Sequence, residues 1–112
     1  MILHNYLSNS GRDLIYEYIN SLPEAEKIDG YTVLQHMEKG EFDKILFKRW
    51  EKQVYEVYFQ KNNRVFYITV DKENIYLLHS CRKQKNKTEK KDANIVRKRA
   101  KELGNMLGRK FI

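Results

Sequence analysis

The sequence is poor in residues that cross-link or anchor small proteins. Its 112 residues include one cysteine, Cys81, one proline and one tryptophan. A single cysteine excludes an intramolecular disulfide and favours a reducing compartment such as the cytoplasm. The three histidines, His4, His36 and His79, lie far apart in the chain, so no close pair of zinc ligands exists. We therefore expect no metal site and no cofactor.

Long hydrophobic runs are also absent. No stretch approaches the roughly 20 apolar residues of a membrane-spanning helix, and no basic segment followed by an apolar one opens the chain. The apolar share of 41% and the aromatic share of 12% are typical of a folded globule. We therefore expect residues 1–112 to form a single soluble cytoplasmic domain.

Acidic residues are scarce in the last part of the chain. From position 82 onward there are 12 Lys and Arg against 3 Asp and Glu, a net charge of +9, whereas the whole chain carries +7 and residues 1–81 therefore carry −2. Positive charge gathered at one end indicates a polyanionic partner, such as nucleic acid, an acidic protein or an anionic membrane. Charge alone does not choose among them.

Apolar spacing predicts two helices in the first forty residues. Apolar side chains recur every three or four positions over residues 12–22, and Pro23 ends the pattern. A second helical pattern follows as far as Gly40, with Gly30 as a weak point in its middle. We expect these helices to form an antiparallel hairpin, preceded by an edge strand within residues 1–7.

The pattern then changes to alternation. Residues 53–60, 64–70 and 75–79 read as three sequential strands with short polar turns, which predicts an antiparallel meander. Thr88 is a candidate N-cap for a last, basic helix, whose apolar residues form one narrow stripe: Ala93, Val96, Ala100, Leu103 and Leu107. The predicted fold class is α+β, with a helical hairpin packed on the meander sheet and a C-terminal basic helix.

Near the C-terminal end of the meander, a Leu-Leu-His run at residues 77–79 is followed by a lysine-rich loop and by a Lys-Thr pair at residues 87–88 that opens the basic helix. This motif, within this order of elements, resembles the phage-derived Gp49-like/HigB branch of the RelE/ParE toxin superfamily. That branch has Leu-Leu-His, then paired lysines, Lys-Thr-Pro and a helix. The matching residues here are Leu77, Leu78, His79, Lys83, Lys87 and Thr88, whereas Gln84 replaces the second paired lysine and Glu89 the proline.

Two strands extend the resemblance. Residues 55–57 stand where the family has Trp-Glu-Leu, and residues 64–67 where it has a strand led by arginine. The arginine that normally follows Trp-Glu-Leu is Tyr58 here, so a customary phosphate-binding or catalytic cation is absent from that strand.

The resemblance implies the toxin of a type II toxin–antitoxin system. It would be a ribosome-dependent mRNA endonuclease that needs no metal, with the ribosome, mRNA and a helix-turn-helix antitoxin as partners, possible hetero-oligomers with the antitoxin, and no membrane partner. The alternative is a non-enzymatic binder on the same scaffold: a gyrase inhibitor of the ParE kind, or an inactive toxin remnant that pairs with antitoxin.

RNA cleavage by the 2′-hydroxyl needs a base, cations at the phosphate and an acid for the leaving oxygen. Arg64, Lys83 and Lys87 are the candidate catalytic cations, and His79 is the candidate proton-transfer group. The candidate RNA-binding residues are Tyr58, Tyr67, Arg82, Lys85, Lys90 and Lys91.

Each candidate has a structural alternative. His79 follows Ile75 and Leu77 on one strand face and is equally interpreted as a half-buried structural histidine, and the loop lysines as solvated surface. Arg64 shares a side with apparent core residues, so it reaches a site only from the strand's end or past a bulge. Tyr58 and Tyr67, which we expect away from the presumed core, are equally interpreted as packing across strands. Glu56 is either a base or a carboxylate that offsets nearby lysines, and Cys81 is interpreted as an inert small residue.

Overall fold

The computed structural model describes residues 1–60, 62–83 and 87–112, and it has the predicted mixed α+β fold. One sheet contains five strands in the order β1-β5-β4-β3-β2. The described elements are β1 (Ile2–Asn5), α1 (Leu14–Asn20), α2 (Glu24–Glu38), the short 3-10 helix η1 (Phe42–Lys44), β2 (Leu46–Glu51), β3 (Val54–Phe59), β4 (Asn63–Thr69), β5 (Asn74–Arg82) and α3 (Lys90–Leu107). No helix in the described parts of the chain is long and apolar enough to cross a membrane.

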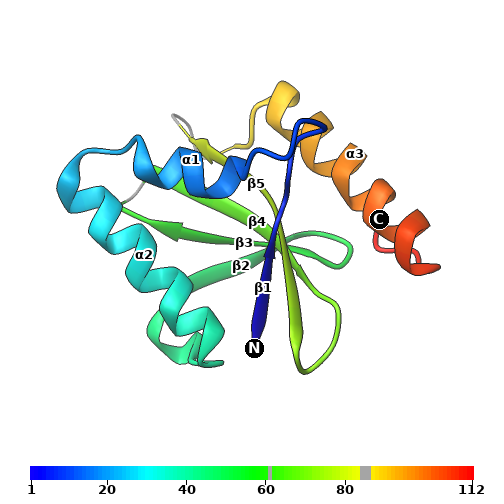
Figure 1. The fold of residues 1–112 in the computed structure, drawn as a ribbon, viewed down its shortest axis with the longest axis horizontal. Helices are drawn as coiled ribbons and strands as arrows, with labels where there is room; N and C mark the ends of the chain where they lie inside the picture. The colour runs from blue at the N-terminus through cyan, green and yellow to red at the C-terminus, as the bar shows by residue number, and fades with distance from the viewer. Residues whose placement is uncertain (61, 84–86) are drawn as a thin grey trace.

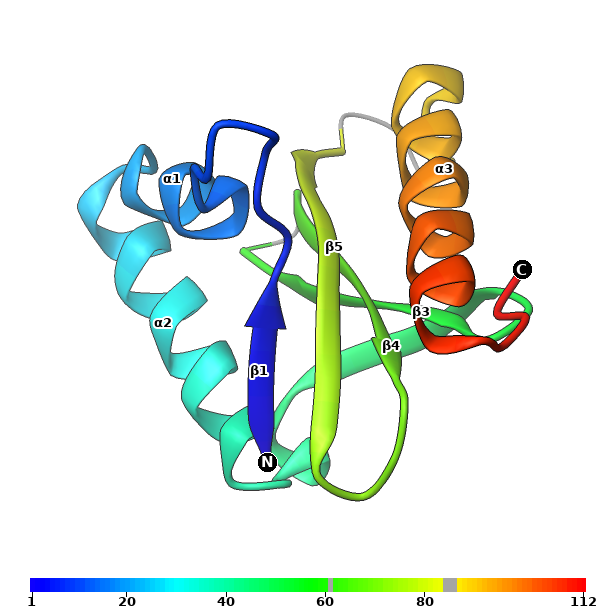
Figure 2. The ribbon, with the colours of Figure 1, turned by 45° about the vertical axis from the view of Figure 1, so that its right-hand side comes forward.

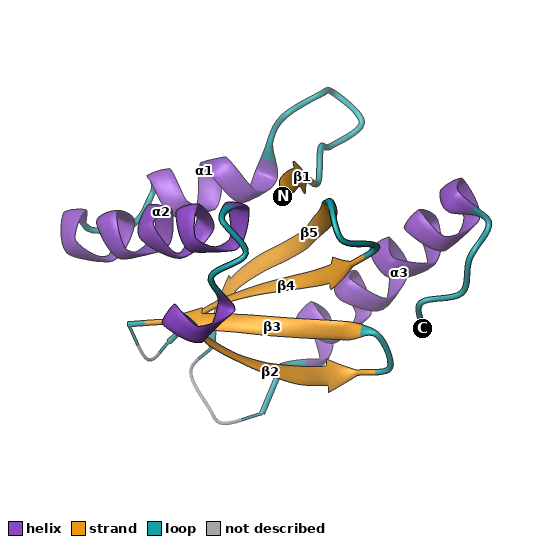
Figure 3. Ribbon diagram, turned by 90° about the horizontal axis from the view of Figure 1, so that it is seen from below, coloured by secondary structure: helices purple, strands orange, loops and turns teal. Residues whose placement is uncertain are grey.

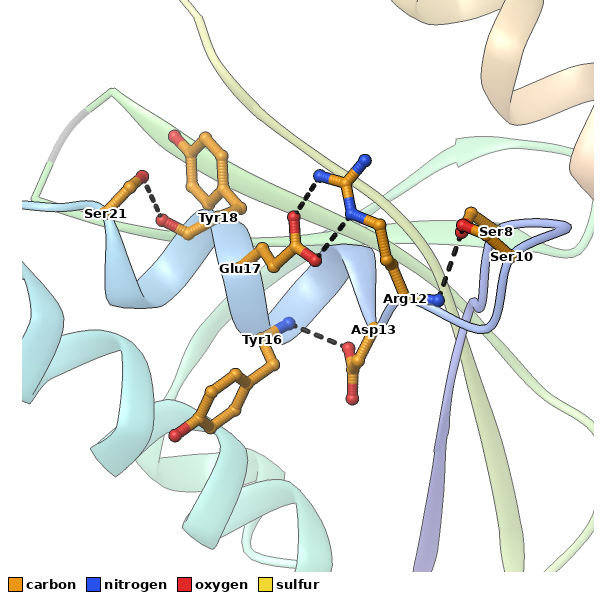
Figure 4. A network of polar contacts seen from close by, with 8 residues as sticks. All are labelled: Ser8, Ser10, Arg12, Asp13, Tyr16, Glu17, Tyr18 and Ser21. Carbon is orange, nitrogen blue, oxygen red and sulfur yellow. Dashed lines mark hydrogen bonds and ion pairs between the residues drawn. The ribbon is translucent and has the colours of Figure 1, made fainter.

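The first helix begins at a side-chain cap. The Asp13 carboxylate accepts a hydrogen bond from the Tyr16 backbone N–H at 2.9 Å, which satisfies a donor that the first helical turn leaves unpaired. Figure 4 shows this cap beside the exposed ion pair between Arg12 and Glu17. Pro23 then precedes α2, so both predicted helices are present.

Gly30 of α2 lies where this helix packs against α1 and β3. It is buried, and a Cβ at this position would lie 3.0 Å from Ile19 of α1 and 3.1 Å from the Phe59 ring of β3. The absent side chain therefore lets α2 approach its neighbours closely. As predicted, α2 continues through Gly30, and the close contacts give this glycine a packing role that the sequence did not indicate.

The sheet is antiparallel from β2 to β5, as the meander predicts. β1 is the predicted edge strand, but it runs parallel to β5, with Ile2 opposite Asn74 and Asn5 opposite Leu77. Figure 2 shows β1 beside β5. A parallel neighbour so distant in sequence leaves no local signal in the chain.

Helices cover both faces of the sheet. Figures 1 and 3 show α1 and α2 on one side and α3 on the other. Val57 and Val65 belong to the core beneath α1 and α2, whereas Phe66 and Ile68 belong to the core beneath α3. The sequence interpretation assumed one core face, which is wrong because alternate residues of β4 enter two different cores.

A β-bulge lies between β4 and β5. Phe66 is opposite His79 while Tyr67 is opposite Leu77, so Leu78 is an extra residue on β5. Leu77 packs beneath α1 and α2, whereas Leu78 packs beneath α3 and the His79 side chain reaches residues of α3. The expectation that His79 shares a face with Leu77 was therefore wrong.

The last helix begins later than predicted. Its N-cap is Glu89, and the buried Thr88 hydroxyl has no hydrogen-bond partner in the described residues, so the predicted Thr88 cap was wrong. The stripe of small and apolar side chains is buried as predicted, except that Leu107 is only partly buried.

The chain reverses after α3 at Gly108, which has a φ of +68°. Phe111 then packs into the core beneath α3 and is 2% exposed. A Cβ on Gly104 would collide with the Arg109 carbonyl oxygen, so this glycine makes room for the returning tail.

Candidate functional site

Several sequence-predicted residues meet where β3, β4 and β5 approach the start of α3. Tyr58 is opposite Arg64 across β3 and β4, and Arg64 is opposite Cys81 across β4 and β5. The bulge turns His79 toward the same face. Residues from three strands therefore form one cluster beneath α3.

A buried carboxylate lies at the centre of this cluster. Glu56 is 1% exposed, and its Oε1 lies 3.1 Å from Arg64 Nε and 3.4 Å from Lys83 Nζ. The Arg64 side chain is 12% exposed and that of Lys83 is 5% exposed. Because a buried charge needs a partner, Glu56 is what allows two cations to occupy this low-dielectric position. Two cations therefore face the same carboxylate.

Lys83 therefore differs from the exposed loop lysine that the sequence suggested. Its ammonium faces Glu56 inside the cluster, and its backbone N–H donates to the Asn62 carbonyl at 2.6 Å. In this conformation Lys83 contacts protein groups in place of solvent.

Tyr58 supports the arginine that faces it. The Arg64 guanidinium lies 4.9 Å from the centroid of the Tyr58 ring, and the Lys48 ammonium lies 6.0 Å from it. Such contacts stabilise a cation through the negative face of the ring. A tyrosine at the family's arginine position thus holds a cation from the adjacent strand. Tyr58 itself is half-buried.

His79 connects β5 to α3 through both ring nitrogens. Nε2 lies 2.8 Å from Asp92 Oδ1, and Nδ1 lies 3.3 Å from Arg99 Nη1. Since a guanidinium only donates, Nδ1 is the acceptor and Nε2–H donates to Asp92. Burial lowers the pKa of His79, partly opposed by Asp92, and Arg99 lowers it further. This geometry favours the half-buried structural histidine over a proton-transfer group.

One group in the described residues has metal-ligand chemistry. The ligand atoms of His79, Cys81 and Asp92 all lie within 4.8 Å of one another. Burial raises the pKa of the Cys81 thiol to about 12, so the thiolate is disfavoured. Arg99 also occupies the position where a metal-bound histidine normally has an acceptor for its second N–H. The donor set therefore fits a metal ion poorly.

Exposed cations lie near Lys83 in the sequence. Lys87, Lys90 and Lys91 are exposed, the last two in the first turn of α3. Arg82 is also exposed, and it donates to Glu26 at 2.8 Å. Lys85 lies outside the described residues. These four described cations are accessible to a polyanion.

Tyr67 is a core residue, so its predicted position away from the core was wrong, and its burial argues against the predicted contact with RNA. It is 2% exposed, and its ring centroid lies 6.0 Å from that of Tyr55 and 6.1 Å from that of Phe42. Burial strongly raises the pKa of its hydroxyl. Tyr67 packs beneath α1 and α2, on the opposite face from Tyr58, because the two occupy strand positions of different parity.

A second polar network, which the sequence did not indicate, joins the strands to the helices. Asn63, fully buried, accepts from the Tyr18 hydroxyl at 2.6 Å and donates to Glu26 at 2.8 Å. The Asn63 hydrogen bond and Arg82 lower the pKa of Glu26. Burial raises the pKa of Tyr18 to about 12. The network fixes Arg82 at the end of β5.

Comparison with known proteins identifies the family. The family model described as "Phage derived protein Gp49-like (DUF891)" matches residues 17–101, which include every residue of the cluster. No curated protein matches the chain significantly. The match covers well over half of the chain and spans the segment from α1 into α3. The chain therefore belongs to the Gp49-like family, a phage-derived, toxin-like family.

Proposed function

We propose that this chain is the toxin of a type II toxin–antitoxin system and that it cleaves mRNA on the ribosome. The toxin-like family supports the first part of this proposal. The cluster of Glu56, Arg64 and Lys83, bordered by exposed lysines, is the observation that carries the second. It combines a carboxylate, which can act as a base, with cations that can stabilise charge on a phosphate.

The proposed reaction begins at the 2′-hydroxyl next to the scissile phosphate. A base takes the hydroxyl proton, the 2′-oxygen bonds to phosphorus, and the bond from phosphorus to the 5′-oxygen breaks. The leaving oxygen takes up a proton, and the other product carries a 2′,3′-cyclic phosphate. Cations stabilise the charge that builds on the phosphate oxygens.

Arg64 is the group that reaches the phosphate in this proposal. Its planar guanidinium suits two phosphate oxygens, and Tyr58 supports it from one side. As the phosphate draws Arg64 outward, Glu56 loses one of its partners and accepts the 2′-hydroxyl proton. Lys83 remains beside Glu56 and supplies a proton toward the leaving oxygen.

The other residues either bind the RNA backbone or position the cluster around Glu56. Lys87, Lys90, Lys91 and Arg82 are exposed and contact the RNA backbone in this proposal. His79 acts as a positioning residue, because its bond to Asp92 ties the end of β5 to α3.

A second candidate function is a non-enzymatic binder on the same scaffold. Burial of the cluster favours it, since Glu56 is 1% and Lys83 6% exposed, which closes the cluster to substrate in this conformation. The basic surface would then bind gyrase, in the manner of the ParE relatives, or an antitoxin alone.

Growth and RNA measurements separate these functions. The wild-type chain would be expressed under tight control beside Arg64→Ala, with mRNA 5′ ends mapped in each. We expect growth arrest with new mRNA ends in the wild type, and at least about 100-fold less cleavage in Arg64→Ala, because a transition-state cation is lost. Arg12→Ala is the matched control, since Arg12 forms an exposed carboxylate pair on α1.

Two outcomes would contradict ribosomal cleavage. Arrest without new mRNA ends would point to gyrase or another target. Absence of arrest from a folded wild-type protein would exclude an active toxin. Circular dichroism of Arg64→Ala distinguishes a loss of catalysis from a loss of folded structure.

A further inference from the structure

Among the residues that the structure describes, β2 is an edge strand with no neighbour on its outer side. It lies at one end of the sheet order and pairs on its other side with β3. In an antiparallel pair, alternate residues direct their N–H and C=O groups away from the partner strand. The six residues of β2 span about 20 Å, enough to pair with a further strand. Figure 3 shows β2 at the border of the sheet.

Apolar side chains accompany this edge. Leu46 is 61% and Phe47 42% exposed, although both are large and hydrophobic. Phe47 borders a hollow of about 350 Å³ that is otherwise lined by Phe42, Tyr55, Tyr67 and Thr69. The hollow crosses β2, β3 and β4 on the same face as α1 and α2. An apolar side chain from an added strand would fit beside Phe47.

Charge argues against a second copy of this chain as the occupant. Lys48 and Arg49 are exposed at the centre of β2. A two-fold antiparallel pairing of β2 with itself would bring these cations opposite one another, which is unfavourable. The neighbouring carboxylate of Glu51 is already bound by Arg97 at 2.8 and 2.9 Å. A strand with carboxylates at the centre is the complementary partner.

We propose that β2 binds an extended acidic segment of another protein by strand addition. Main-chain hydrogen bonds to β2 supply affinity, and alternate side chains supply specificity. On the face of Phe47 an apolar side chain enters the hollow, and on the opposite face a carboxylate lies beside Lys48. The proposal does not rest on RNA cleavage, because the outer edge of β2 and the hollow beside Phe47 lie outside the cluster around Glu56, although Lys48 also contacts the Tyr58 ring.

The test uses the full chain labelled with ¹⁵N and an end-blocked peptide of alternating valine and glutamate. We expect amide shifts concentrated in residues 46–51, and slower hydrogen exchange of the outward-facing amides of β2. Binding should weaken by roughly tenfold or more in Phe47→Asp and in the double variant Lys48→Glu/Arg49→Glu, each of which removes one part of the recognition.

Matched controls separate strand addition from simple charge attraction. The variant Lys72→Glu/Lys98→Glu makes the same change in net charge at exposed positions in the β4–β5 turn and on α3, and it should bind the peptide almost as the wild type does. A peptide with a central proline lacks a backbone N–H and should bind at least about tenfold more weakly. Unchanged amide shifts elsewhere show that each variant is folded.

Three results would overturn the proposal. If the proline peptide bound as tightly as the original peptide, electrostatic attraction and not strand addition would account for binding. Shifts of the β2 amides on addition of single-stranded RNA, stronger than those with the peptide, would assign the edge to nucleic acid. Shifts of the same amides that grow with protein concentration alone would assign it to a second copy of this chain.

Discussion

At the scale of single residues, burial separates structural from accessible polar groups. Glu56 and Lys83 are almost fully enclosed, and His79 has both ring nitrogens bound, whereas Lys87, Lys90 and Lys91 face solvent. The enclosed groups set geometry and local charge, and the exposed ones are available to a polyanion. The sequence alone does not show which of these residues are buried and which are exposed.

His79 should make folding stability depend on pH. Burial lowers its pKa below the usual value of about 6.5, so the unfolded state takes up a proton at a higher pH than the folded state does. The unfolding free energy is therefore fully present above about pH 7 and falls as the pH drops through about 6.5 toward the folded-state pKa. Three charged groups influence this histidine: Asp92, Arg99 and Lys91.

Urea denaturation at several pH values between about 5.5 and 7.5 checks this expectation. Wild type should lose stability toward the acidic end, and His79→Gln should lose distinctly less. His36→Gln is the matched control, because His36 also lies beside a carboxylate, that of Glu41. Glu26 and Glu51 have lowered pKa values, so their stabilisation is lost only below about pH 4.5. Equal pH dependence in wild type and His79→Gln would contradict the assignment.

Single residues also show where sequence patterns stop being informative. Alternation placed Tyr58 and Tyr67 on one face, yet they lie on opposite faces. The two-residue period holds along β3 and along β4, but the two strands are related by their register, which depends on pairing between strands. The burial of Lys83 depends on Glu56, 27 positions earlier in the chain. Neither relation is visible in a local window of sequence.

At the scale of secondary-structure elements, local patterns were sufficient where neighbours in sequence are neighbours in space. The helices that Pro23 separates, the meander from β3 to β5 and the apolar stripe of α3 all follow from periodicity. The parallel pairing of β1 and the bulge at Leu78 do not, because each depends on contacts between strands. The bulge matters most for the site, since it turns His79 toward α3.

The end of α3 yields a prediction about Gly104. Alanine is normally the better helix former, by about 1 kcal/mol over glycine. Here the added Cβ would collide with the Arg109 backbone, so Gly104→Ala should lower the unfolding free energy by about 1–3 kcal/mol through overpacking. Urea denaturation of the full chain measures the effect.

A chain truncated before Arg109 tests whether the collision with the returning tail causes this loss of stability. In a chain that ends at Gly108, the Arg109 carbonyl is absent, and the same substitution should be neutral or stabilising relative to the truncated parent. The truncation itself removes Phe111 from the core and is compared only with its own variant. Equal destabilisation in both backgrounds would show that the returning tail is not the reason for this glycine.

At the scale of the whole molecule, charge is the property that sequence predicts most directly. The positive excess lies entirely in residues 82–112, and its exposed cations extend from the end of β5 along α3 into the tail: Arg82, Lys87, Lys90, Lys91, Arg97, Lys98, Lys101, Arg109 and Lys110. Several cations of the same segment are paired internally, among them Arg82 with Glu26, Lys83 with Glu56 and Arg97 with Glu51. The formal net charge of this segment therefore overstates the positive charge that is available to a partner.

Salt dependence of RNA binding should report the exposed lysines. For a single-stranded RNA oligonucleotide, each phosphate contact contributes about 0.7 to the slope of log affinity against log salt. If Lys90 and Lys91 each contact one phosphate, the variant Lys90→Ala/Lys91→Ala should have a slope shallower by about 1.4. Fluorescence anisotropy over a range of salt concentrations measures it.

The control for this measurement is Lys39→Ala/Lys72→Ala. It removes the same charge from exposed positions on other elements and should change the slope little. If both double variants reduce the slope equally, general charge and not the surface at α3 determines binding.

The pairing of β1 with β5 bears on how the molecule forms during translation. Ile2 pairs with Asn74, so an early segment must wait for one synthesised 72 positions later. Such distant contacts slow folding, because a long loop has to close before they form. The cluster around Glu56 likewise needs Lys83, and its cover needs α3. A nascent chain therefore completes neither its sheet nor this cluster until most of it has emerged from the ribosome that makes it.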